Sequence, residues 1–198
     1  MLDDDDVILL TVPGWGDSGD KHWQSLWELT YPLARRVRQE DWLYPDKAVW
    51  VVALRRAIEE TDAAIVIAAH SLGCHTAVAC LRQLDLPSQR RIKGVLLVAP
   101  PALPITPTTA LSAGELPPGA PAPAFTGFET TEAGKLPVPA VMVASRNDHF
   151  CPFAEAERMA ALWGVKLVDA GEADHMGSHA GLGSWPKGQQ LLQRFMLA

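Results

Sequence analysis

Short apolar runs rich in β-forming residues alternate along this chain with segments whose apolar residues recur at helical spacing. The runs are too short for helices and lack polar alternation, which is typical of strands buried on both faces of a parallel sheet. We expect strands at Val7–Thr11, Ala63–Ala69, Lys93–Ala99, Val138–Ala144 and Val165–Asp169. We expect a helix capped by Asp20, and further helices at Ala48–Glu60, Leu72–Leu84, Phe153–Trp163 and Gln189–Leu197. The alternation predicts an α/β three-layer sandwich, with a mainly parallel sheet and helices on both of its faces.

The length of 198 residues favours one domain over residues 1–198. Residues 100–139 interrupt the alternation, because they hold ten of the sixteen prolines and little charge. Proline blocks regular elements, so we interpret this Pro-rich segment as a surface excursion of the domain. Two interpretations stay open, a partial lid over the sheet edge and a loose loop. We expect its Phe125 and Phe128 to be exposed.

Composition excludes several classes of protein. The formal charge of −6 argues against a nucleic-acid partner, which requires a dense basic face. The apolar runs are far shorter than the about 20 residues of a membrane-spanning helix, and the acidic start of the chain is unlike a secretory signal. The three cysteines, Cys74, Cys80 and Cys151, form no CxxC pair, which suits a reducing compartment. We therefore expect a soluble cytoplasmic protein.

A candidate nucleophile follows the second predicted strand, in Ala69-His70-Ser71-Leu72-Gly73. This is close to the G-x-S-x-G nucleophile elbow, with Ala69 in place of the first glycine. So tight a turn requires small residues two before and two after the serine, because a larger side chain would strike the neighbouring strand or helix. The turn would expose the Ser71 hydroxyl at the carboxyl end of the sheet, where sites in such folds gather.

An activated serine requires a histidine base and a carboxylate that orients it, in the chain order Ser, Asp, His for this fold. Asp148 follows the strand Val138–Ala144, and His175 follows the strand Val165–Asp169, so both lie at strand carboxyl ends. Asp169 and Asp62 are rival acids. Asp169 is too near the histidine in sequence, and Asp62 precedes its strand, at the opposite end of the sheet. We therefore expect Ser71, Asp148 and His175 to form a catalytic triad.

Backbone N–H groups must stabilise the oxyanion that forms when a serine attacks a carbonyl. The N–H of Leu72 at a helix start is the first candidate. The loop Val12-Pro13-Gly14-Trp15-Gly16 follows the first strand and supplies the second. We expect the N–H of Trp15 there, with Gly16 as the alternative one residue along.

Four segments together resemble the small α/β-hydrolases of the retinoblastoma-binding-protein-9-like predicted serine hydrolase family. They are Val12–Gly19 with His22-Trp23-Gln24 behind it, Ala69–Cys74, Ala144–Asp148, and His175 followed by the loop Gly181-Leu182-Gly183-Ser184-Trp185-Pro186. The resemblance spans the chain apart from the Pro-rich segment. It implies a shortened α/β-hydrolase fold without a large cap, with Ser71, Asp148 and His175 as the triad.

The histidine loop departs from the family pattern. The family often has Gly-His-x-Asn there, whereas this chain has Asp174-His175-Met176-Gly177. Asp174 would either perturb the imidazole or face water. The L-x-C-x-E motif of pocket-protein ligands is absent, so retinoblastoma binding is not carried over.

The remaining histidines and tryptophans have simpler interpretations than catalysis. We expect His70 and His75 to be packed structural histidines, His22 to anchor the first helix, and His149 to line the site mouth or to face solvent. Trp15 and Trp185 flank the site in sequence, and either wall a pocket or pack in the core. His175 and His179 are four residues apart, but the glycines around them oppose a helix, so we expect no metal site.

The sequence thus predicts a serine hydrolase that cleaves a small ester, thioester or amide through an acyl-enzyme intermediate, with no metal or organic cofactor. Its partner would be a small-molecule acyl substrate. Acyl transfer to an acceptor other than water would use the same residues. A protein from another class, which binds a partner through residues 100–139 on a hydrolase scaffold with vestigial catalysis, is the alternative.

Overall fold

A computed structural model of the protein describes residues 6–106, 121 and 124–198. Residues 1–5, 107–120 and 122–123 lie outside the described range. The interpretation of the Pro-rich segment as a partial lid therefore concerns mainly residues outside this range. Within the described part of the chain, none of the helices has the length and apolarity needed to cross a bilayer.

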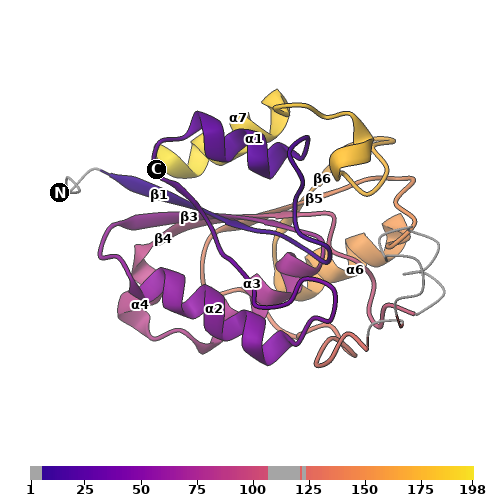
Figure 1. Cartoon of the computed structure of the whole chain (residues 1–198), viewed down its shortest axis with the longest axis horizontal. Helices are drawn as coiled ribbons and strands as arrows, with labels where there is room; N and C mark the ends of the chain where they lie inside the picture. The colour runs from indigo at the N-terminus through magenta and orange to yellow at the C-terminus, as the bar shows by residue number, and fades with distance from the viewer. Residues whose placement is uncertain (1–5, 107–120, 122–123) are drawn as a thin grey trace.

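Six parallel strands form one sheet in the order β2-β1-β3-β4-β5-β6. Their bounds are β1 Val7–Val12, β2 Ala34–Arg36, β3 Ala64–His70, β4 Ile92–Val98, β5 Ala140–Ala144 and β6 Lys166–Asp169. Because every pair is parallel, the carboxyl ends of the strands lie along the same edge of the sheet (Figure 1). The loops after β1, β3, β5 and β6 therefore reach one another.

Helices cover both faces of this sheet. Helices α1 (Trp23–Thr30) and α7 (Pro186–Met196) lie on one face, and α2 (Lys47–Glu59), α3 (Leu72–Gln83), α4 (Leu86–Arg91) and α6 (Phe153–Trp163) lie on the other (Figure 1). Successive side chains of a strand point to opposite faces of the sheet. In β1, Ile8 and Leu10 pack in the core beneath α2 and α3, and Leu9 packs with the tryptophans of α1. The solid apolar runs are thus explained by burial on both faces. This α/β three-layer sandwich is the architecture that the alternation of runs predicted, and it is the α/β-hydrolase fold that the family resemblance implied.

Some local features differ from the sequence-based expectation. The edge strand β2 and the short helix α4 were not predicted, because neither carries a long apolar pattern. The cap of α1 is His22, whose Nδ1 accepts the N–H of Gln24, so the expectation of a cap at Asp20 was wrong. Helix α7 begins at Pro186, three residues before its predicted start, since proline suits the first turn of a helix.

Phe125 and Phe128 are buried, so the expectation that they are exposed was wrong. Phe125 packs edge-on against Trp15 at a ring distance of 5.1 Å, and Phe128 packs against Trp50 at 5.9 Å. A segment without regular structure still buries its large apolar side chains when a third core cluster lies beneath it. Phe125 therefore packs onto the loop after β1, and Phe128 packs onto α2.

Four tryptophans and Trp185 pack in the core, whereas Trp15 borders a cavity. Trp23, Trp27, Trp50 and Trp163 are fully buried, as expected for packing residues. Trp185 stacks on Trp27 at 5.8 Å and touches Trp23, so it belongs to the core between α1 and α7. Trp15 instead borders the cavity in front of Ser71.

Candidate active site

Ser71 occupies a strained turn between β3 and α3. Its backbone has φ 53° and ψ −126°, a conformation that non-glycine residues rarely adopt outside functional sites. Small neighbours make the turn possible: a Cβ on Gly73 would lie 2.2 Å from the carbonyl oxygen of Val12. A Cβ on Gly14 would lie 2.7 Å from the Cβ of Ser71. The loop after β1 can therefore approach the nucleophile elbow only because both positions are glycine.

A hydrogen-bonded chain joins three side chains that are far apart in sequence. The Nε2 of His175 lies 2.7 Å from Oγ of Ser71, and its Nδ1 lies 2.9 and 2.8 Å from Oδ1 and Oδ2 of Asp148. Asp148 is 8% exposed and also accepts the N–H of Phe150 at 2.8 Å. With Nδ1–H donating to the carboxylate, Nε2 is left as the acceptor for the serine proton.

The rival acids lie elsewhere. Asp169 pairs with Arg146 at 2.6 Å on the surface, where this hydrogen-bonded partner lowers the pKa of its carboxyl. Asp62 is exposed ahead of β3, at the opposite end of the sheet. Of the three candidate carboxylates, only Asp148 contacts His175.

The two candidate oxyanion donors belong to different elements. Leu72 is the first residue of α3, so its N–H has no acceptor within the helix. In the loop after β1, the N–H of Gly16 donates to the carbonyl of Trp42 at 3.0 Å. This bond occupies the alternative donor and leaves Trp15 as the candidate. The Trp15 side chain is held in turn by a bond from its Nε1 to the carbonyl of Leu43 at 2.9 Å.

The loop that carries His175 is supported by polar contacts from two sides. His70 donates its Nε2 proton to the carbonyl of His175 at 2.9 Å. Asp174 accepts from Nδ2 of Asn147 at 2.8 Å, and its N–H donates to Oδ1 of the same amide at 2.9 Å. Asp174 thus bonds to Asn147 rather than to the imidazole. Asn147 precedes the predicted acid Asp148 in the sequence. The sequence carried no signal that Asn147 would pair with Asp174 on another loop.

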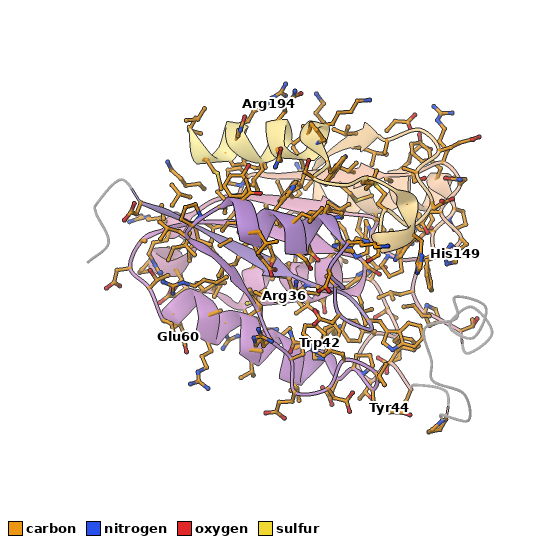
Figure 2. The ribbon with its side chains drawn as sticks, turned by 45° about the horizontal axis from the view of Figure 1, so that its top comes forward. Arg36, Trp42, Tyr44, Glu60, His149 and Arg194 are labelled. Carbon is orange, nitrogen blue, oxygen red and sulfur yellow. The ribbon has the colours of Figure 1, made fainter. Side chains whose placement is uncertain are left out.

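A cavity of about 400 Å³ opens in front of Ser71. Five histidines line it, together with Trp15, Leu43, Ile105, Phe150 and the aspartates Asp17 and Asp174. The five are His22, His70, His149, His175 and His179. Figure 2 shows His149 at the end of the molecule where the strands finish, and its ring lies 5.8 Å from that of His175. His149 therefore lines the site mouth while remaining exposed.

The buried histidines of this region are neutral. Burial, with the charges of Arg36 and His175 adding to it, lowers the pKa of His22 to about 3. Burial also lowers the pKa of His70 well below its usual value. His75 is packed away from the cavity, where its Nε2 bonds to the carbonyl of Pro101 at 2.8 Å.

The cysteines are packing residues in this structure. Cys74 is fully buried on α3, and burial raises the pKa of its thiol, which keeps it protonated and unreactive. Within the described ranges, no three side chains of histidine, cysteine or acidic residues are grouped to hold a metal ion. His179 lies in a 3₁₀ turn at Ser178–Ala180 and not on a helix shared with His175.

Comparisons with known proteins agree with this architecture. A solved YdeN-like hydrolase from Pectobacterium atrosepticum is 33% identical, covers 96% of this chain and 90% of its own, and superposes with a TM-score of 0.78. The ydeN gene product of B. subtilis is 20% identical over 97% of this chain and 99% of its own, with a TM-score of 0.70. A thermophilic esterase from Thermogutta terrifontis is 16% identical over 96% of this chain and 89% of its own, with a TM-score of 0.64, and shares the fold.

The search of curated proteins found no significant match. The family model described as serine hydrolase matches residues 9–194. This range includes the elbow at Ser71 and the loops that carry Asp148 and His175. The chain belongs to the serine hydrolase family.

Proposed function

We propose that this protein cleaves a small carboxylic ester, thioester or amide through an acyl-enzyme intermediate, with Ser71, His175 and Asp148 as its catalytic triad. The observation that carries the proposal is the hydrogen-bonded chain from Asp148 through His175 to Ser71. Ser71 Oγ attacks the substrate carbonyl carbon while His175 Nε2 takes its proton. Asp148 holds the imidazole in the required tautomer and stabilises its positive charge.

The tetrahedral intermediate places negative charge on the former carbonyl oxygen. The N–H groups of Leu72 and Trp15 are the proposed donors to it, and each such donor contributes about 3–4 kcal/mol in other enzymes. Collapse of the intermediate breaks the bond to the leaving group, which receives the proton from His175. A water molecule then attacks the acyl-enzyme and His175 takes its proton. The bond between the acyl carbon and Ser71 Oγ breaks, His175 returns the proton to Oγ, and the free acid leaves. The sequence of steps consumes one water and needs no cofactor.

Several finer statements belong to this proposal. The motifs favour placement near the retinoblastoma-binding-protein-9-like group within the family, and the three unpaired cysteines favour a cytoplasmic location. Residues 1–198 are proposed to form one domain that acts on a small-molecule substrate. The partner-binding alternative loses its support from Phe125 and Phe128, because both side chains are buried.

The test is labelling of the wild type and of Ser71→Ala with a fluorophosphonate probe, followed by hydrolysis of p-nitrophenyl esters of increasing acyl length. We expect labelling and hydrolysis by the wild type, with both lost in Ser71→Ala. Addition of an alcohol or thiol acceptor would distinguish hydrolysis from acyl transfer. A folded wild type that neither labels nor hydrolyses any ester would contradict the proposal.

A further inference from the structure

His22 carries an N–H group that has no hydrogen-bond acceptor within the described residues. Its Nδ1 accepts the N–H of Gln24 at 3.1 Å, and a neutral imidazole has only one proton, so the proton is on Nε2. The ring is 3% exposed, and Nε2 is buried without a partner. Buried N–H groups are nearly always paired, because an unpaired one loses its hydration without compensation. Since the ring lines the cavity in front of Ser71, the missing acceptor points to a ligand in that cavity.

The charge of the surroundings limits which acceptor fits. Burial lowers the pKa of His22 to about 3, so the ring is a neutral donor at ordinary pH. Two aspartates, Asp17 and Asp174, line the cavity, and no lysine or arginine does so among its described lining residues. Asp17 is paired with Arg36 at 3.0 Å, so a carboxylate or phosphate group would meet chiefly the negative charge of Asp174, without a lysine or arginine of the described lining to pair with it. An uncharged oxygen can accept the Nε2–H of His22 and is not repelled by a carboxylate.

Gly177 lies beside the rings of His22 and His70. A Cβ on Gly177 would lie 4.0 Å from Cδ2 of His22 and 3.7 Å from Cε1 of His70, which is ordinary contact distance. The backbone there has φ −93°, so any residue could adopt its conformation. Because residue 177 is glycine, the position that a Cβ would occupy beside the rings of His22 and His70 is not filled by a side chain.

The donor belongs to a residue that lines the same cavity as the reacting atoms. The His22 ring lies 4.6 Å from the His70 ring, which lies 5.1 Å from the ring of His175. His175 Nε2 in turn lies 2.7 Å from Oγ of Ser71. A substrate whose carbonyl carbon is at Ser71 can extend along this cavity toward His22, because both residues line it.

We propose that the Nε2–H of His22 binds the substrate, and that the enzyme prefers esters or thioesters carrying an uncharged oxygen acceptor, a keto, amide or ether oxygen, a few bonds from the reacting carbonyl. Substrates with a carboxylate at that place are disfavoured. This inference rests on the proposed function, because it uses the same cavity and the same nucleophile. The acceptor belongs either to the acyl part or to the alcohol part of the substrate.

Probes of one shape separate the effect of the oxygen from that of size. The acyl arm uses p-nitrophenyl esters of 4-oxopentanoic acid, 4-methylpentanoic acid and succinic acid, which differ in a keto oxygen, a methyl group and a carboxylate. The alcohol arm uses the butyrate esters of 4-acetylphenol and 4-isopropylphenol. The measured quantity is the ratio of kcat/KM between oxo and alkyl probes, since intrinsic reactivity cancels when this ratio is compared between variants.

Three variants test this interaction, two at His22 and one at Gly177. His22→Asn keeps a side-chain acceptor for the N–H of Gln24 and so retains the helix cap, but it lacks the Nε2 donor. His22→Ala lacks both and controls for loss of the cap. Gly177→Ala adds a methyl group beside the donor without backbone strain, and it carries the test if the His22 variants unfold.

We expect the oxo-to-alkyl ratio in one arm to fall about three- to tenfold in His22→Asn and Gly177→Ala, the range of one neutral hydrogen bond. The succinyl probe should react about tenfold or more slowly than the oxo probe in the wild type. Equal ratios in the wild type and both variants, with labelling and hydrolysis intact, would overturn this inference alone. Absence of labelling and hydrolysis in the wild type would overturn the proposed function and this inference together.

Discussion

His70 donates its Nε2 proton to the main-chain carbonyl of His175 at 2.9 Å. The residue that precedes the nucleophile therefore holds the loop that carries the proposed base. Because His70 is buried and neutral, the bond does not change as the pH falls through the ordinary pKa of histidine. The distance from His175 to Ser71 is thus controlled from the elbow itself.

We expect His70→Leu to lower kcat by about 10²-fold, because a base displaced by about 1 Å loses its alignment with the serine. His70→Gln retains a donor and should recover a large part of that loss. The measurement is kcat and KM for one p-nitrophenyl ester, with unfolding curves for both variants. Equal losses in the leucine and glutamine variants would show that the bond to His175 has no positioning role.

Asp148→Asn should lower kcat/KM by about 10³- to 10⁴-fold, since an amide cannot stabilise the imidazolium or select its tautomer. Asp169→Asn is the matched control, because Asp169 pairs with Arg146 on the surface and does not touch His175. The same ester assay measures both. Activity retained in Asp148→Asn but lost in Asp169→Asn would reassign the acid.

Gly14→Ala should abolish labelling by the fluorophosphonate probe, because the new Cβ would lie 2.7 Å from the Cβ of Ser71 and must displace the loop or the nucleophile. Gly19→Ala on the same loop is the control. Its Cβ would have no neighbour nearer than the Ser178 hydroxyl at 4.0 Å, so labelling should persist. Comparable labelling of both variants would mean that the close approach of Gly14 is not required.

Stability should fall as the pH drops below about 6.5. The folded-state pKa is lowered to about 3 for His22 and to about 4 for His75, and it is lowered well below the usual value for His70. The unfolded chain binds protons near pH 6.5 while the folded chain does not, so acid favours unfolding. Each histidine contributes up to about 1.4 kcal/mol per pH unit in that window.

Urea unfolding at pH 7.5, 6.0 and 5.0 measures this slope. His75→Gln should reduce it by about a third, since one of the three groups no longer titrates. A free energy of unfolding that is unchanged between pH 7.5 and 5.0 would contradict the burial of these rings as neutral histidines.

The sequence by itself determined the α/β alternation and hence the parallel sheet, because strands buried on both faces must be apolar throughout. It also placed Ser71, Asp148 and His175 at strand carboxyl ends, since the loops after parallel strands lie on one edge. Helix α6 at Phe153–Trp163 was predicted with the bounds that the structure has.

Only the tertiary structure decided contacts between loops that are distant in sequence. It assigned the N–H of Gly16 to the carbonyl of Trp42, paired Asp174 with Asn147 and buried Phe125 against Trp15. It also left the Nε2–H of His22, near Gly177, without an acceptor among the residues that the structure describes. Local patterns carry no information on such pairs, because which loop meets which depends on strand order and on the packing of the helices between them.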